Sequence, residues 1–103
     1  MTINHGFHAV MTALPGRGDE LVALLLDAPS LPNEDCVVFL VSRSGSNPDV
    51  VSVAEGWTSR EAHAAFFAAD EAQAFVAKLQ PLLAGESQYT DAIPVGGKPA
   101  LRV

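Results

Sequence analysis

The sequence has few charged residues and, among them, few bases. Six Lys and Arg residues stand against twelve Asp and Glu, which gives a formal net charge of −6, and no basic cluster occurs anywhere in the chain. Binding to nucleic acid or to an anionic membrane surface requires a concentrated basic patch. The composition therefore argues against both kinds of partner.

Cysteine is also scarce. The one cysteine, Cys36, lies in an apolar run, so it can form neither an internal disulfide nor a thiolate metal site. The first residues lack the basic start and apolar core of a secretory signal, and no apolar run approaches the length of a membrane span. We therefore expect a cytoplasmic protein that does not enter the membrane.

Apolar residues, in contrast, are abundant. Hydrophobic residues make up 49% of the chain and charged residues 17%, a balance that favours a compact fold over disorder. A length of 103 residues suffices for one hydrophobic core but not for two. We expect a single domain over residues 1–103, with an irregular C-terminal extension from about residue 96.

The pattern of apolar residues and turn residues predicts six elements. β-prone segments cover residues 6–14, 36–41, 50–57 and 86–95, and helical patterns cover residues 19–27 and about 58–84. Thr58 and Glu61 have the spacing of a capping box at the start of the second helix, and Asp70 marks a second start signal within it. The order βαββαβ predicts an α+β, ferredoxin-like domain with a four-stranded antiparallel sheet.

This arrangement has a consequence for assembly. Two helices can cover only one face of a four-stranded sheet, yet the strand over residues 36–41 is apolar on both faces. A sheet open to water on one face would alternate between apolar and polar residues instead. We expect a second copy of the chain to cover the open face, although a ligand or a local insertion would also explain the pattern.

Histidines are the main candidates for acid–base chemistry. His5 and His8 lie three residues apart in a predicted strand, so they point to opposite faces and cannot bind one metal ion together. His8 and His63 remain as candidate catalytic bases. Glu55 and Asp91 are expected to be surface or edge charges, because this topology does not make their strands neighbours.

Aromatic residues predict a binding site for a flat ring. Trp57 ends a predicted strand just before a helix cap, where sheet, helix and loop meet and pockets often form. Phe66, Phe67 and Phe75 add aromatic surface on the helix that follows. We name these four residues as candidate substrate-binding residues, with packing of the core as the alternative role.

Three segments resemble the antibiotic biosynthesis monooxygenase family. They are the run from Val53 to Ala62, the run from Gln73 to Leu83, and the Pro15-Gly16 pair before the first helix. The resemblance implies a homodimeric α+β barrel that oxygenates quinols or polycyclic aromatics without metal, flavin or haem. In the haem-degrading branch of the fold, an asparagine of the first strand, a helix tryptophan and a haem-ligating histidine would fall at Ala9, Phe66 and Val76. The resemblance therefore does not extend to haem degradation.

The resemblance leads to a first functional hypothesis. We expect a cofactor-free monooxygenase in which the substrate supplies the electrons and His63 or His8 moves the proton. Histidines that many relatives carry would fall at Phe66 and Glu71 in this chain. Two alternatives therefore stay open. One is a non-catalytic dimeric barrel that binds a small apolar ligand or is a stress-related scaffold, and the other is a cyclase or isomerase with the same barrel fold.

Overall fold

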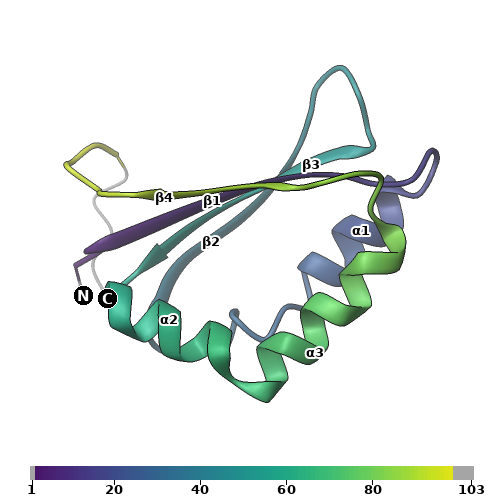
Figure 1. Cartoon of the computed structure of the whole chain (residues 1–103). Coiled ribbons are helices and arrows are strands. Elements are labelled where there is room, and N and C mark those ends of the chain that lie inside the picture. The colour runs from purple at the N-terminus through teal and green to yellow at the C-terminus, as the bar shows by residue number, and fades with distance from the viewer. Residues whose placement is uncertain (1, 99–103) are drawn as a thin grey trace.

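The protein folds as an antiparallel sheet with every helix of the described chain on one face (Figure 1). The computed structural model describes residues 2–98. The elements are β1 (His5–Thr12), α1 (Gly18–Leu25), β2 (Cys36–Arg43), β3 (Val50–Trp57), α2 (Arg60–Ala68), α3 (Asp70–Leu79), the 3₁₀ turn η1 (Gln80–Leu82) and β4 (Gln88–Ala92). This order confirms the predicted α+β, ferredoxin-like fold.

The strands lie in the order β2-β3-β1-β4, and all three neighbouring pairs are antiparallel. The central strand β1 pairs with β3 on one side and with β4 on the other. Phe7 of β1 therefore lies opposite Glu55 of β3 and also opposite Asp91 of β4. The topology places the two acidic residues on either side of one aromatic residue, on the same sheet face.

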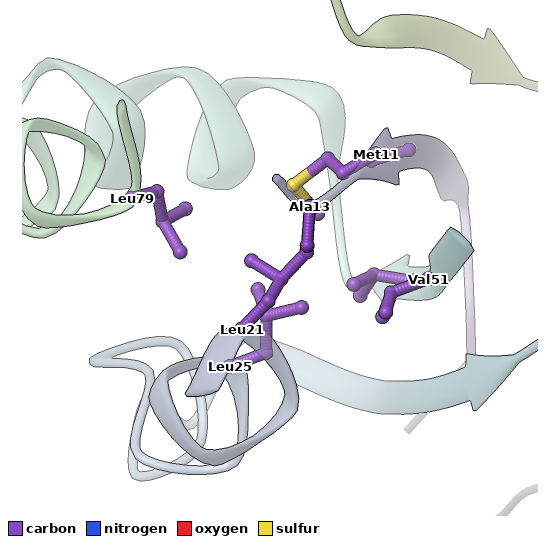
Figure 2. Packing of buried hydrophobic residues seen from close by; sticks show 8 residues of the cluster. Met11, Ala13, Leu21, Leu25, Val51 and Leu79 are labelled. Atoms are coloured by element: carbon purple, nitrogen blue, oxygen red, sulfur yellow. The ribbon is translucent and has the colours of Figure 1, made fainter. Parts of the chain in front are cut away.

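The hydrophobic core lies between the sheet and the helices. Alternate residues of the central strands, such as Met11 of β1 and Val51 of β3, point toward α1 and are buried. Figure 2 shows Leu21 and Leu25 of α1 meeting these strand residues, with Leu79 of α3 approaching from the side. This packing follows from the period of two in the strands and the helical spacing of the leucines.

The helical segment after β3 is divided in two, and its cap differs from the prediction. Ser59 caps α2 by accepting a 3.0 Å hydrogen bond from the backbone N–H of Ala62. The expected capping box at Thr58 is wrong, because the Thr58 hydroxyl instead donates to Asp35 at 2.8 Å. The chain is extended at Ala69, so α2 ends there and α3 begins at the predicted second start signal.

Other predicted boundaries shift by a few residues. The first strand begins one residue earlier than expected, and the last covers five residues rather than ten. Residues 93–98 have no regular secondary structure, and the rest of the expected C-terminal extension, residues 99–103, lies outside the described residues. Within residues 2–98, no helix has the length and apolar character needed to cross a bilayer.

Candidate functional site

A group of polar side chains on the helix-covered face of the sheet lies where β3 leads into α2. His5 begins β1 and Trp57 ends β3, and the register places these two residues opposite each other. Glu55 lies two residues before Trp57, so its side chain is on the same face. In Figure 1 this end of the sheet lies above α2, which contributes His63. The β3–α2 junction and the neighbouring strand β1 thus form the centre of the site.

These side chains form a polar chain from the interior to the surface. The indole N–H of Trp57 donates to Glu55 Oε1 at 2.9 Å, and that oxygen lies 3.9 Å from His63 Nε2. His63 Nδ1 is 3.1 Å from His5 Nε2, which lies 3.4 Å from Asp91 Oδ1. Trp57 is fully buried, whereas the Asp91 side chain is 71% exposed. The chain therefore reaches from the buried end of β3 to the exposed edge of the sheet, with its widest gap between Glu55 and His63.

Aromatic rings enclose the histidine pair. The His63 ring lies 4.8 Å from Phe7 and 4.9 Å from Trp57, measured between ring centroids. Phe66, one turn of α2 further on from His63, packs its ring 5.1 Å from that of Trp57. The imidazole of His63 thus packs against two aromatic rings of the sheet, and its side chain is 13% exposed.

This enclosure shifts the pKa of His63 and the pKa of Glu55. Burial lowers the pKa of His63 below its usual value of 6.5, and the neighbouring His5 lowers this pKa further while Asp91 opposes the change. Burial also raises the pKa of the Glu55 carboxyl, against the lowering effect of the Trp57 hydrogen bond. At neutral pH, His63 is therefore an uncharged imidazole that can accept a proton.

The structure brings together three of the residues that the sequence singled out. His63, Trp57 and Phe66 are in contact at the junction. His8 is an exposed residue on the opposite face of the sheet, so it cannot act on the same group as His63. Phe67 lies next to Phe66 on α2 but is 47% exposed and makes no aromatic pair among the described residues.

Phe75 belongs to a different region. It lies on α3 and lines an open cleft of about 420 Å³ together with Glu71, Lys78 and the segment that follows α1. The full lining comprises Asp27, Ala28, Pro29, Leu31, Pro32, Glu71, Ala74, Phe75 and Lys78. We call His5, Glu55, Trp57, His63 and Asp91 the histidine cluster. None of these residues lines the cleft, so the cleft and the cluster are separate features.

Sequence reasoning missed His5, Glu55 and Asp91 as members of the site. The expectation that Glu55 is a surface charge is wrong, because the side chain is only 12% exposed and points under α2. The available signal was the alternation of β3, which puts Glu55 on the same face as the buried Val53 and Trp57. His5 lies 58 residues from His63 in the chain, so no local spacing could indicate their contact.

The structure is a ferredoxin-like α+β domain with a cluster of histidine, acidic and aromatic side chains between sheet and helix. The model of the antibiotic biosynthesis monooxygenase family matches residues 5–78, which include every member of the cluster except Asp91. The chain belongs to this family. None of the curated proteins matches the chain.

Solved structures support the same assignment. One solved structure, described as an antibiotic biosynthesis monooxygenase, comes from Chloroflexus aurantiacus. It is 32% identical, with a TM-score of 0.78, and the match covers 93% of this chain and 97% of that one. A Caulobacter crescentus structure with a similar name is 22% identical, with a TM-score of 0.80 over 91% and 92%. A third, from Deinococcus radiodurans, is 19% identical, with a TM-score of 0.80 over 95% and 99%. The last two show the fold alone.

Proposed function

We propose that the chain is a cofactor-independent monooxygenase that oxidises a quinol or another hydroxylated aromatic molecule with dioxygen. Membership of the family supports the reaction class. The observation that carries the proposal is the neutral, enclosed His63, whose Nδ1 is 3.1 Å from His5 and whose Nε2 is 3.9 Å from Glu55. We further propose that the protein acts as a cytoplasmic homodimer.

The chemistry needs a base more than it needs a cofactor. A phenol with a free para C–H reacts with dioxygen to give a quinone and water, so the substrate itself supplies all four electrons: one oxygen atom enters the quinone and the other leaves as water. The protein must remove the phenolic proton, because the phenolate passes electrons to dioxygen more readily than the phenol does. Holding the ring in place and excluding water complete its task.

His63 is the proposed base, and it acts through Nε2. In the tautomer with a proton on Nδ1, His63 donates to His5 Nε2, and its own Nε2 is left with a free lone pair. The 3.9 Å separation from Glu55 is longer than a hydrogen bond, so Nε2 can accept from a substrate hydroxyl. The imidazolium that forms lies near Glu55 and, through His5, near Asp91.

The aromatic ring of the substrate is proposed to lie against Phe66 and the edge of His63. Phe66 is half-buried, so part of its ring is available for contact, whereas Trp57 has no exposed surface. Trp57 therefore acts in this proposal by holding Glu55 and by supporting Phe66 from behind. Phe67 and Phe75 are further from the cluster and are assigned at most to the outer part of a larger substrate.

Oxygen consumption tests the proposal directly. Purified protein mixed with a panel of phenols and quinols should consume oxygen in proportion to quinone formed. His63→Gln keeps the polarity and much of the volume but removes the base, so turnover should fall by about 100-fold or more. His8→Gln should retain it. Loss of activity in His8→Gln with full activity in His63→Gln would move the reaction to the other sheet face.

The same experiment separates the two alternative functions. A cyclase or isomerase would convert the substrate without consuming oxygen, and it would still depend on His63. A non-catalytic binding protein would bind an aromatic molecule without changing it. Binding without turnover in every case would favour the binding protein, for which the 420 Å³ cleft beside Phe75 offers a second place to look.

A further inference from the structure

We propose that His5, His63 and Asp91 bind one divalent first-row transition-metal ion. Each side chain offers one ligand atom, and the three atoms lie within 4.8 Å of one another. His5 Nε2 lies 3.1 Å from His63 Nδ1 and 3.4 Å from Asp91 Oδ1. Ligand atoms about 2.1 Å from a shared ion, at tetrahedral or right angles, are about 3.0–3.4 Å apart. The two pairs therefore already have the spacing of ligands around one ion.

The ligands are held by different elements that are fixed relative to each other. β1 and β4 are hydrogen-bonded neighbours, with Phe7 opposite Asp91 and Gly6 opposite Ala92. His63 is held by its ring contacts with Phe7 and Trp57. The three atoms spread over up to 4.8 Å, which is wider than one ion can bridge, so the exposed Asp91 side chain has to turn inward for all three to bind. The two histidines need no such movement.

A supporting shell is also present around His63. With Nδ1 bound to the ion, the other ring nitrogen carries the proton and faces the Glu55 carboxyl at 3.9 Å. Glu55 is itself held by the N–H of Trp57 at 2.9 Å. A carboxylate that accepts a hydrogen bond from the second nitrogen of a metal-bound histidine fixes the tautomer and the orientation of the ring, and Glu55 would have to move closer than 3.9 Å to do so.

The ligand set indicates the class of ion. Two imidazoles and one carboxylate suit Zn²⁺, Co²⁺, Ni²⁺ or Cu²⁺, whereas Mg²⁺ and Ca²⁺ prefer oxygen ligands. Three protein ligands leave at least one position for water. The Asp91 side chain is 71% exposed at the outer strand of the sheet, so an ion can reach the site from solvent. His5 and His63 lie behind it and are far less exposed.

Binding of the ion would stop the proposed reaction. With the ion bound to Nδ1, the single ring proton of neutral His63 must move from Nδ1 to Nε2. That nitrogen can then no longer accept a proton from a substrate. This inhibitory consequence rests on the proposed function, whereas the binding of the ion does not.

Calorimetry with Zn²⁺ and the visible spectrum of Co²⁺ test the site on tag-free protein treated with a chelator. We expect one ion per chain. His5→Ala and Asp91→Asn should each weaken binding by about tenfold or more, because loss of a ligand costs at least as much as loss of a supporting group. His8→Ala removes the same type of side chain from the opposite sheet face and should leave the affinity unchanged. Asp91→Asn changes an exposed residue, and circular dichroism checks that it folds.

Each outcome bears on a different part of the proposal. Absence of Zn²⁺ binding, or wild-type affinity in both His5→Ala and Asp91→Asn, would overturn the metal site. Binding that leaves oxygen uptake by the wild-type protein unchanged would overturn the inhibitory consequence alone. If no phenol or quinol is oxidised, the proposed function fails, and calorimetry still decides whether the site binds the ion.

Discussion

At the scale of single residues, Trp57 connects the stability of the domain to the arrangement of the site. Its ring is fully buried between the sheet and α2, and its N–H holds the carboxyl of Glu55 at 2.9 Å. The same ring packs against His63 and Phe66. A substitution that keeps an apolar ring but removes the N–H touches both roles, and each role has its own measurement.

Trp57→Phe is therefore expected to affect both roles. Loss of the hydrogen bond and of part of the ring should lower the free energy of unfolding by about 1–3 kcal/mol. Without its donor, Glu55 is no longer held beside His63, so kcat/KM for a phenol should fall as well. Urea denaturation and steady-state kinetics measure the two effects. If the folded variant turns over like the wild type, Trp57 serves the core alone.

Cys36 provides a second test at this scale. Burial, followed by the nearby Glu55, raises the pKa of its thiol to about 12, although a backbone hydrogen bond to Val38 acts in the opposite direction. The thiol should therefore stay protonated and react slowly with iodoacetamide at pH 8, compared with the urea-unfolded chain. Mass spectrometry of timed samples measures the difference. Equal labelling rates in the folded and unfolded chain would contradict the assignment.

The same raised pKa has a consequence for stability. The folded state holds the thiol proton more tightly than the unfolded chain, whose thiol has the ordinary pKa of 9.0. The contribution of Cys36 is thus fully present below pH 9 and is lost as the pH rises toward 12. Cys36→Ser should reduce this alkaline loss in urea titrations compared at pH 8 and pH 10.5. The same loss in both proteins would show that other groups cause it.

The site shows what a sequence can and cannot reveal about single residues. His63, Trp57 and Phe66 lie within ten positions of one another, so the strand-to-helix junction suffices to bring them together. His5 and Asp91 join them only because β1 lies between β3 and β4. That register depends on pairing across the whole chain, which the local pattern of residues does not encode.

At the scale of elements, Asp49 links two parts of the chain that are far apart in sequence. Its carboxylate accepts hydrogen bonds from the backbone N–H groups of Gly16 and Gly18, each at 3.0 Å. It thereby fixes the end of the β2–β3 loop to the start of α1. Gly18 must lack a side chain here, because a Cβ atom would overlap the carbonyl oxygen of Pro48.

Asp49→Ala should destabilise the domain by about 1–2 kcal/mol, because it removes the acceptor for two N–H groups at the start of a helix. Asp49→Asn is the matched control: it keeps one acceptor oxygen and removes the charge, so it should lose less. Urea denaturation of the three proteins gives the order. Equal stability of all three would show that water replaces the carboxylate at no cost.

The order of helices and strands could be predicted from the turn residues and helix start signals in the sequence. Glycine and proline separate the strands from the helices, and Asp70 supplied the signal for the break between α2 and α3. The cap of α2 was not predictable, because Thr58 and Ser59 are both good capping residues. Ser59 caps the helix because the Thr58 hydroxyl already donates to Asp35, which is 23 residues away in the chain.

At the scale of the whole molecule, the main feature is the sheet face without helices. Val10, Val38, Leu40 and Val50 point to this face, and Leu40 is 59% exposed. Alternation fails in β2 because Phe39 and Val41 are apolar on the helix side as well. Apolar side chains of β1, β2 and β3 therefore lie partly exposed on the open face, beside polar ones such as His8 and Ser52, and these apolar side chains support the proposed homodimer.

Light scattering should give a mass of about twice the 10.8 kDa of one chain. An obligate dimer buries about 2,000 Å² or more, and a charge in the middle of such an interface is costly. Leu40→Lys should therefore shift the protein to monomers. It should change the stability of the single chain by only about 0.5 kcal/mol, because the side chain is exposed there.

Leu26, at the end of α1, is also 59% exposed, so Leu26→Lys is a matched control on the helix side. A dimer that survives Leu40→Lys but dissociates with Leu26→Lys would place the interface on the helices, and a monomeric wild type would leave the open face without the proposed partner.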